Sequence, residues 1–73
     1  MVDINKLKAR MVLMGHDQQS LTAACKEKGY KASYNTINRK FNGLSPWTCD
    51  DADMMCDVLE IIDPAERANI FLA

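Results

Sequence analysis

The segment between Ser33 and Gly43 contains the side chains best suited to recognising another molecule. Asn35 lies three residues before Asn38 and four before Arg39, so a helix would bring their side chains to one side. An asparagine amide offers a donor and an acceptor that match the N6 and N7 edge of adenine, and the arginine fork matches O6 and N7 of guanine. This pattern predicts the reading of DNA bases. The alternative interpretation is a solvated helix face, although folding alone gives no reason for two exposed asparagines in a short helix.

Lysine and tyrosine side chains around this segment are expected to contact the DNA backbone. Lys26, Lys31 and Lys40 are suited to phosphates, which fix the register of a protein on DNA without reading sequence. Tyr34, in the first turn of the expected helix, could donate to a phosphate or press its ring against a thymine methyl group.

A second contact region is expected where another helix begins after Asp17. Backbone amides beside Gln18 and Gln19 could meet a phosphate there, although the Asp17 carboxylate would compete for them. Ser33 is the expected N-cap of the base-reading helix. The complete set of expected DNA-binding residues is Gln18, Gln19, Lys31, Ser33, Tyr34, Asn35, Asn38, Arg39 and Lys40.

The two parts of the chain carry opposite charge, although the net charge is only -1. Residues 1–48 contain eight lysines and arginines against three acids, a balance of +5. Residues 49–73 contain one arginine against seven acids, a balance of -6. This division suggests one face for a polyanion and another turned away from it, while the alternative is undirected variation in surface charge.

Length and composition limit the remaining classes of protein. Seventy-three residues make one domain with a marginal core. No apolar run could cross a bilayer and the start of the chain lacks a signal-peptide pattern, so a cytoplasmic protein is expected. Three cysteines and a single histidine favour reduced, buried thiols over a disulfide framework or a zinc site. Without a glycine-rich phosphate loop or a set of nucleophile, base and orienting group, we expect no enzyme, no cofactor and no small-molecule ligand.

Caps and stop signals predict an all-α chain of five short helices, because no segment alternates as a half-buried strand would. Asp63-Pro64-Ala65-Glu66 is the clearest helix start, with an N-cap acid followed by proline at the first helical position. Thr48 and Asp51 form a capping-box pattern. The expected helices run from near Asp3 to Gly15, from Asp17 to Gly29, from Tyr34 to Asn42, from Thr48 to at least Leu59, and from Asp63 to Leu72.

Two stretches of the sequence carry a family resemblance. Asp17-Gln18-Gln19-Ser20-Leu21 and Thr36-Ile37-Asn38-Arg39-Lys40-Phe41-Asn42-Gly43 resemble the Cro/cI-like (XRE-type) helix-turn-helix regulators of bacteria and prophages, and the similarity covers nearly the whole chain. The resemblance implies a lambda-repressor-like domain over residues 1–73, with the helix at about 33–42 in the major groove. It also implies a regulator of the small phage repressor or Cro type, bound to double-stranded DNA as a homodimer.

The connection between the second and third expected helices departs from this pattern, because residues 26–32 exceed the compact turn of the family. Either the second helix gains a turn and ends at Gly29, or a looped insert carries Tyr30 and Lys31 toward the DNA backbone.

A different class of function is also open. A small helical adaptor, such as an antirepressor or a phage assembly factor, would use the acidic C-terminal helices to bind a protein.

Overall fold

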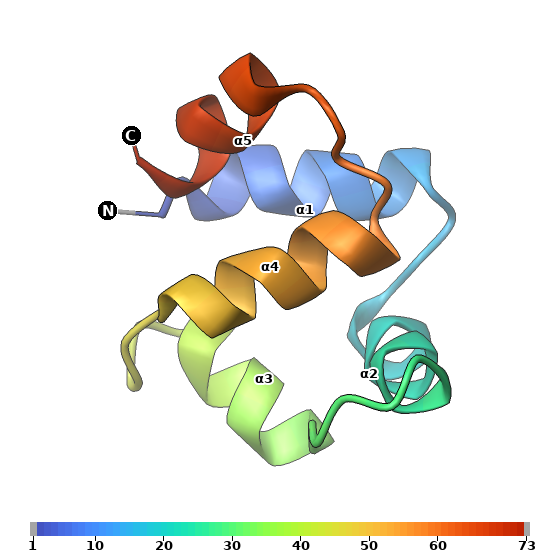
Figure 1. Cartoon of the computed structure of the whole chain (residues 1–73). Coiled ribbons are helices and arrows are strands. Elements are labelled where there is room, and N and C mark those ends of the chain that lie inside the picture. The colour runs from blue at the N-terminus through green and yellow to red at the C-terminus, as the bar shows by residue number, and fades with distance from the viewer. Residues whose placement is uncertain (1, 73) are drawn as a thin grey trace.

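The computed structural model of the chain describes residues 2–72, and within that range it contains five helices and no strand (Figure 1). The expectation of an all-α chain with five short helices is therefore confirmed. The helices are α1 (Ile4–Leu13), α2 (Gln18–Glu27), α3 (Tyr34–Phe41), α4 (Cys49–Val58) and α5 (Pro64–Phe71). No helix in the described range is long and apolar enough to cross a membrane.

Every helix begins at the side-chain cap that the sequence indicates. The caps accept hydrogen bonds from backbone amides that would otherwise lack a partner in the first helical turn. Asp17 and Ser20 form a reciprocal capping box at α2, and Thr48 and Asp51 form another at α4. The N-caps of the five helices are Asp3, Asp17, Ser33, Thr48 and Asp63.

All five helices contribute to one core. Full burial of a leucine or isoleucine side chain contributes about 1.5–3 kcal/mol, so a few such residues decide the stability of a chain this short. Trp47 makes edge-to-face contacts with Phe41 and Phe71, at centroid distances of 5.3 and 6.3 Å. The largest fully buried side chains are Leu7, Leu21, Ile37, Met55, Leu59 and Cys25.

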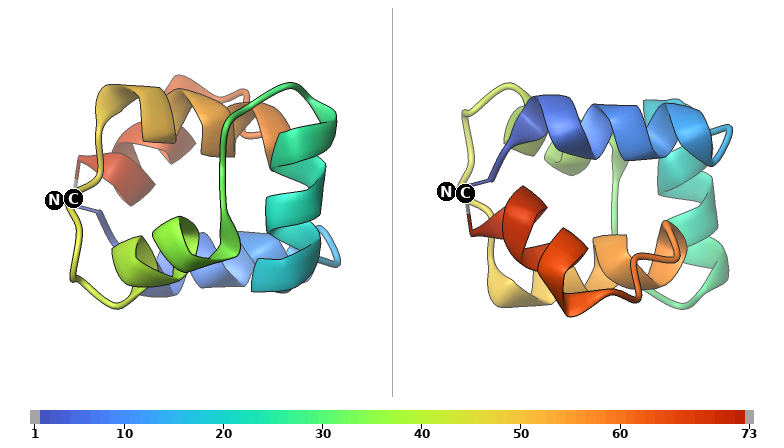
Figure 2. Two further views of the ribbon diagram at one scale, coloured as in Figure 1. Left: turned by 90° about the horizontal axis from the view of Figure 1, so that it is seen from below. Right: turned by 90° about the horizontal axis from the view of Figure 1, so that it is seen from above.

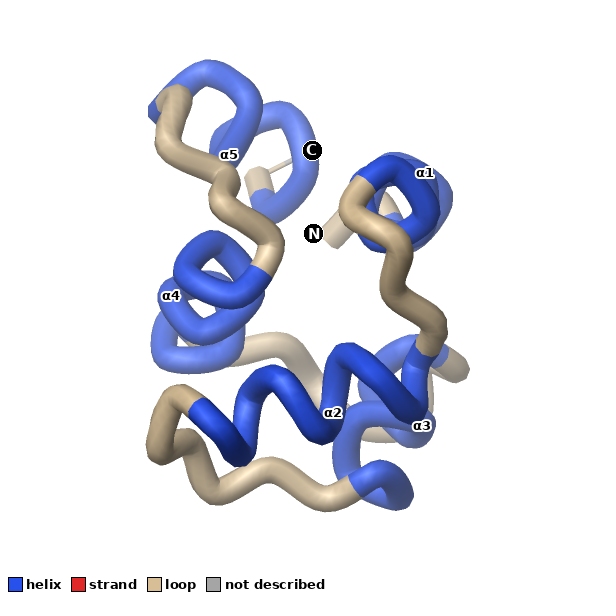
Figure 3. Tube along the Cα trace, turned by 90° about the vertical axis from the view of Figure 1, so that its right-hand side faces the viewer, coloured by secondary structure: helices blue, strands red, loops and turns tan. Residues whose placement is uncertain are grey.

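The helices α2 and α3 form one end of the molecule, and α5 lies toward the opposite end (Figures 1 and 3). The helix α2 packs against α3 and α4, while α1 packs against α5. The left view of Figure 2 looks onto the end formed by α2 and α3, where no other helix lies in front of α3. One side of α3 is therefore open to an approaching partner.

The connection between α2 and α3 follows the first of the two expected courses only in part, because α2 ends at Glu27 with Lys28 as its C-cap. Gly29 adopts a φ of +91°, a left-handed conformation that favours glycine, and the amide of Tyr30 donates to the carbonyl of Cys25 to close the helix end. Tyr30 turns toward α4, where its hydroxyl donates to Asp57 at 2.9 Å. Tyr30 is therefore held against α4 and does not extend outward, whereas Lys31 is exposed. The six connecting residues 28–33 still exceed the three- to four-residue turn of a compact helix-turn-helix.

All five helices end one or two residues before the expected bounds, and α2, α4 and α5 end at Glu27, Val58 and Phe71. The helix α1 ends at Leu13 with Met14 as its C-cap, and α3 ends at Phe41 with Asn42 as its C-cap. In α1 and α3 the C-cap is the residue directly before the glycine. The helix ends one residue earlier, because the C-cap has already left helical geometry.

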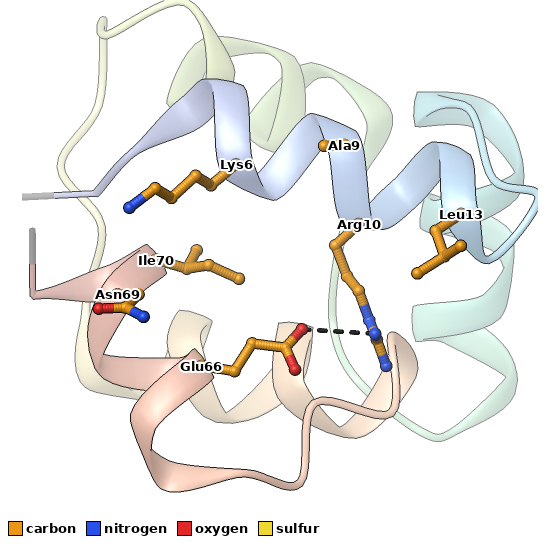
Figure 4. A pocket seen from close by; sticks show the side chains of 7 residues that line it. All are labelled: Lys6, Ala9, Arg10, Leu13, Glu66, Asn69 and Ile70. Atoms are coloured by element: carbon orange, nitrogen blue, oxygen red, sulfur yellow. Dashed lines mark ion pairs between the residues drawn. The ribbon is translucent and has the colours of Figure 1, made fainter.

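Arg10 joins three helices on the side of the molecule away from α3. Its Nε donates to the carbonyl of Leu59 at 3.0 Å and its Nη2 to that of Glu60 at 2.8 Å. Its Nη1 lies 3.3 Å from the Glu66 carboxylate of α5 (Figure 4). Glu60 has a φ of 55°, so Arg10 supports a strained residue just after α4 as well as the carbonyl of the C-cap Leu59.

We expect Arg10→Met to lower the free energy of unfolding by about 1.5–3 kcal/mol, the usual contribution of hydrogen bonds to a charged group. Urea denaturation followed by circular dichroism would measure the change. Lys6→Met is the matched control, because Lys6 is 55% exposed and 3.9 Å from its ion-pair partner Asp3. Equal losses in the two variants would contradict the role assigned to Arg10.

Candidate nucleic-acid interface

The helix α3 presents a polar face directly opposite its buried face. Ile37 and Phe41 are one turn apart and almost fully buried, which fixes the rotation of the helix about its axis. Asn35 and Arg39 are also one turn apart, and both are exposed on the opposite face. Their side chains can therefore meet the same ligand.

The remaining polar residues of α3 differ more in their exposure than the sequence suggests. Asn38 is half-buried, because it lies closer to the core-facing side than Asn35 and Arg39 do. Tyr34 is 45% exposed at the start of the helix. Thr36 was missed as a candidate: it is exposed, and its hydroxyl accepts a hydrogen bond from Ser33 at 2.8 Å.

Arg39 is exposed and only lightly held. Its Nε lies 3.3 Å from the hydroxyl of Ser45 and its Nη2 lies 3.4 Å from the carbonyl of Leu44. Both are long hydrogen bonds to the connection that follows α3, so little energy is lost when the guanidinium turns outward. Arg39 can therefore serve both this connection and a ligand beside α3.

Lys40 requires a correction, because its ammonium group is occupied within the molecule. It lies 2.5 Å from Oδ2 of Asp51 and 3.1 Å from the carbonyl of Pro46. The Lys40 and Asp51 side chains are only 12% and 15% exposed. Breaking such a pair would cost more than a surface contact returns, so Lys40 is not a free phosphate contact.

The Asp51 carboxylate is stabilised in its charged form. Burial alone would raise its pKa, but hydrogen bonds from Lys40 and from the amide and hydroxyl of Thr48 outweigh burial and lower the pKa. The amide of Thr48 donates to Asp51 at 2.8 Å. Asp51 therefore caps α4 and binds the end of α3 with the same carboxylate.

The expected contacts outside α3 lie at the same end of the molecule. Lys31 and Lys26 are exposed, and neither forms an ion pair within residues 2–72. Gln19 is exposed at the start of α2, whereas Gln18 is half-buried and its Oε1 has no partner among the described residues. The amide of Ser20 donates to Asp17, which lowers the pKa of that carboxyl and keeps it charged. The competition expected from Asp17 at this helix start is therefore present.

The division of charge along the sequence is only partly a division in space. Three ion pairs join the basic part to the acidic part: Lys28 with Asp57, Lys40 with Asp51, and Arg10 with Glu66. These bases are neutralised locally and add little to a field that would attract a polyanion.

No family model, curated protein or solved structure matches the chain.

The charge on Asp51 gives a prediction for stability against pH. Because its pKa is lower in the folded chain than its ordinary value of 3.8, its stabilisation is complete above that value and is lost as the pH falls through the folded value. The wild type should therefore exceed Asp51→Asn in unfolding free energy most clearly above pH 3.8, with the gap narrowing below it. Urea titrations between about pH 2.5 and pH 6 would test this, and a constant gap would contradict it.

Proposed function

We propose that this chain is a sequence-specific regulator that binds double-stranded DNA with α3 in the major groove. The observation that carries the proposal is the exposed pair Asn35 and Arg39, one turn apart, on a capped helix whose opposite face is buried. Their amide and guanidinium groups are those that read adenine and guanine. An α-helix with its side chains is about 10–12 Å across, which fits the major groove of about 12 Å.

Neighbouring groups support this mode of binding. Lys31 and Lys26 would contact phosphates, together with the first amides of α2 beside Gln19. Tyr34 would contact the backbone or a thymine methyl group. With Lys40 occupied by Asp51, the phosphate contacts are fewer than the composition of residues 1–48 suggests, and the affinity for arbitrary sequences should be weak.

We further propose a homodimer on DNA, in a lambda-repressor-like arrangement with helix-turn-helix geometry, as the resemblance to Cro/cI-like regulators implies. A regulator of this kind would act by occupying an operator in the cytoplasm. Selection of bound sites from a random DNA library would recover paired half-sites if two copies bind, and single sites if one does.

The test of base reading uses Asn35→Ala and Arg39→Ala against a site selected from that library. Each variant should lose about 5- to 150-fold in affinity for the selected site, the equivalent of one good base contact, with little change on unrelated DNA. Asn5→Ala is the matched control, because Asn5 is an exposed asparagine on α1. Equal losses on selected and unrelated DNA would contradict base reading.

An adaptor that binds protein is the second candidate, and one observation favours it. Val12 and Leu13 are adjacent apolar side chains at the end of α1, 75% and 72% exposed, and a partner protein would cover them. An adaptor would leave genomic DNA fragments unretarded even at about 50 mM salt, where electrostatic binding is strong. Retardation there, followed by enrichment of a defined site, favours the regulator.

A further inference from the structure

We propose that Lys40 is a positioning residue that sets the orientation of α3 for base reading by binding Asp51 at the start of α4. This inference rests on the proposed function. An exposed lysine in α3 would contact DNA directly. Lys40 would instead act through Asp51, because its charge faces into the molecule.

The contacts of Lys40 join the end of α3 to the elements that follow it. Its ammonium group donates to the carbonyl of Pro46, in the connection between α3 and α4, and to Asp51 in the first turn of α4. Asp51 is held in turn by the amide of Thr48. The polar contact thus spans the corner between the two helices, and both partners have little freedom to move.

An aromatic contact supports the other side of this corner. Phe41 follows Lys40 and packs edge-to-face against Trp47, which also contacts Phe71 of α5. The aromatic contact attaches α3 to the core, whereas the ion pair links the end of α3 to the first turn of α4. We therefore assign the angle between α3 and α4 to the ion pair, and the attachment of α3 to the core to the aromatic residues.

The angle of α3 matters because its reading residues lie away from the corner. Asn35 lies five residues before Lys40, about 7.5 Å along the helix axis. A tilt of about 10° at Lys40 would move Asn35 by more than an ångström, beyond the precision that a positioned binding group needs. Loss of the ion pair should therefore weaken base reading without removing any group that touches DNA.

The experiment compares Lys40→Met, Asp51→Asn and the double variant on a selected site and on unrelated DNA. If Lys40 positions α3, each single variant loses about tenfold or more on the selected site, as if one base contact were lost, and keeps its affinity for unrelated DNA. The double variant loses no more than the worse single variant, because both act through one contact.

If Lys40 instead contacted a phosphate, Asp51→Asn would change the affinity for DNA in the opposite direction. Asp51→Asn would then release Lys40 and raise the affinity for all DNA, while Lys40→Met would lower the salt slope by about 0.9. Either result overturns the proposal. Lys31→Met is the positive control for that behaviour, because Lys31 is exposed and forms no ion pair within residues 2–72.

Two further comparisons separate positioning from other effects of the substitutions. Asp53→Asn removes the same charge from α4 at the exposed pair with Arg67, and it should leave the preference for the selected site unchanged. Losses that add in the double variant would mean that Asp51 acts only as a cap, and would overturn the proposal. Should Lys40→Met fail to fold by circular dichroism, Lys40→Arg and Asp51→Glu provide the same test with charges kept and geometry changed.

The wild type distinguishes failure of this inference from failure of the proposed function. A wild type that selects no site from the library overturns both. A wild type that selects a site, with variants that keep its full preference, overturns only the positioning role.

Discussion

The burial of Ile37 and Phe41 is the constraint on which the proposed recognition surface depends. These two side chains fix how α3 is rotated, and so determine which of its residues face outward. With them in the core, Asn35 and Arg39 are presented together, whereas Asn38 and Lys40 lie at the two edges of the exposed face. A different rotation would expose Asn38 and bury part of Arg39.

Five of the nine lysines and arginines form two groups with different roles. Arg10, Lys28 and Lys40 bind carboxylates of the C-terminal part and so join helices that are distant in sequence. Lys26 and Lys31 remain exposed near α3. The nearly neutral net charge therefore hides a small set of bases available to a polyanion, and recognition would depend more on hydrogen bonds to bases than on charge.

The sequence predicted those features that depend on neighbouring residues. The caps at Asp17, Ser33 and Thr48 form within three residues of their partners, so the local pattern contains the whole interaction. The core positions of α3 followed from helical spacing in the same way.

The features that escaped prediction depend on tertiary contacts. The position of Lys40 is decided by Asp51, eleven residues later, and the course of the connection after α2 is decided by Tyr30 reaching Asp57. Neither partner can be identified before the angle between the helices is known.

The central claim is that DNA meets the exposed face of α3. Nuclear magnetic resonance of isotope-labelled protein, titrated with a selected duplex, tests this residue by residue. If DNA binds there, the largest changes in amide shift occur over residues 34–39 and at the start of α2. Changes concentrated in the acidic helices α4 and α5, or no change at any residue, would contradict it.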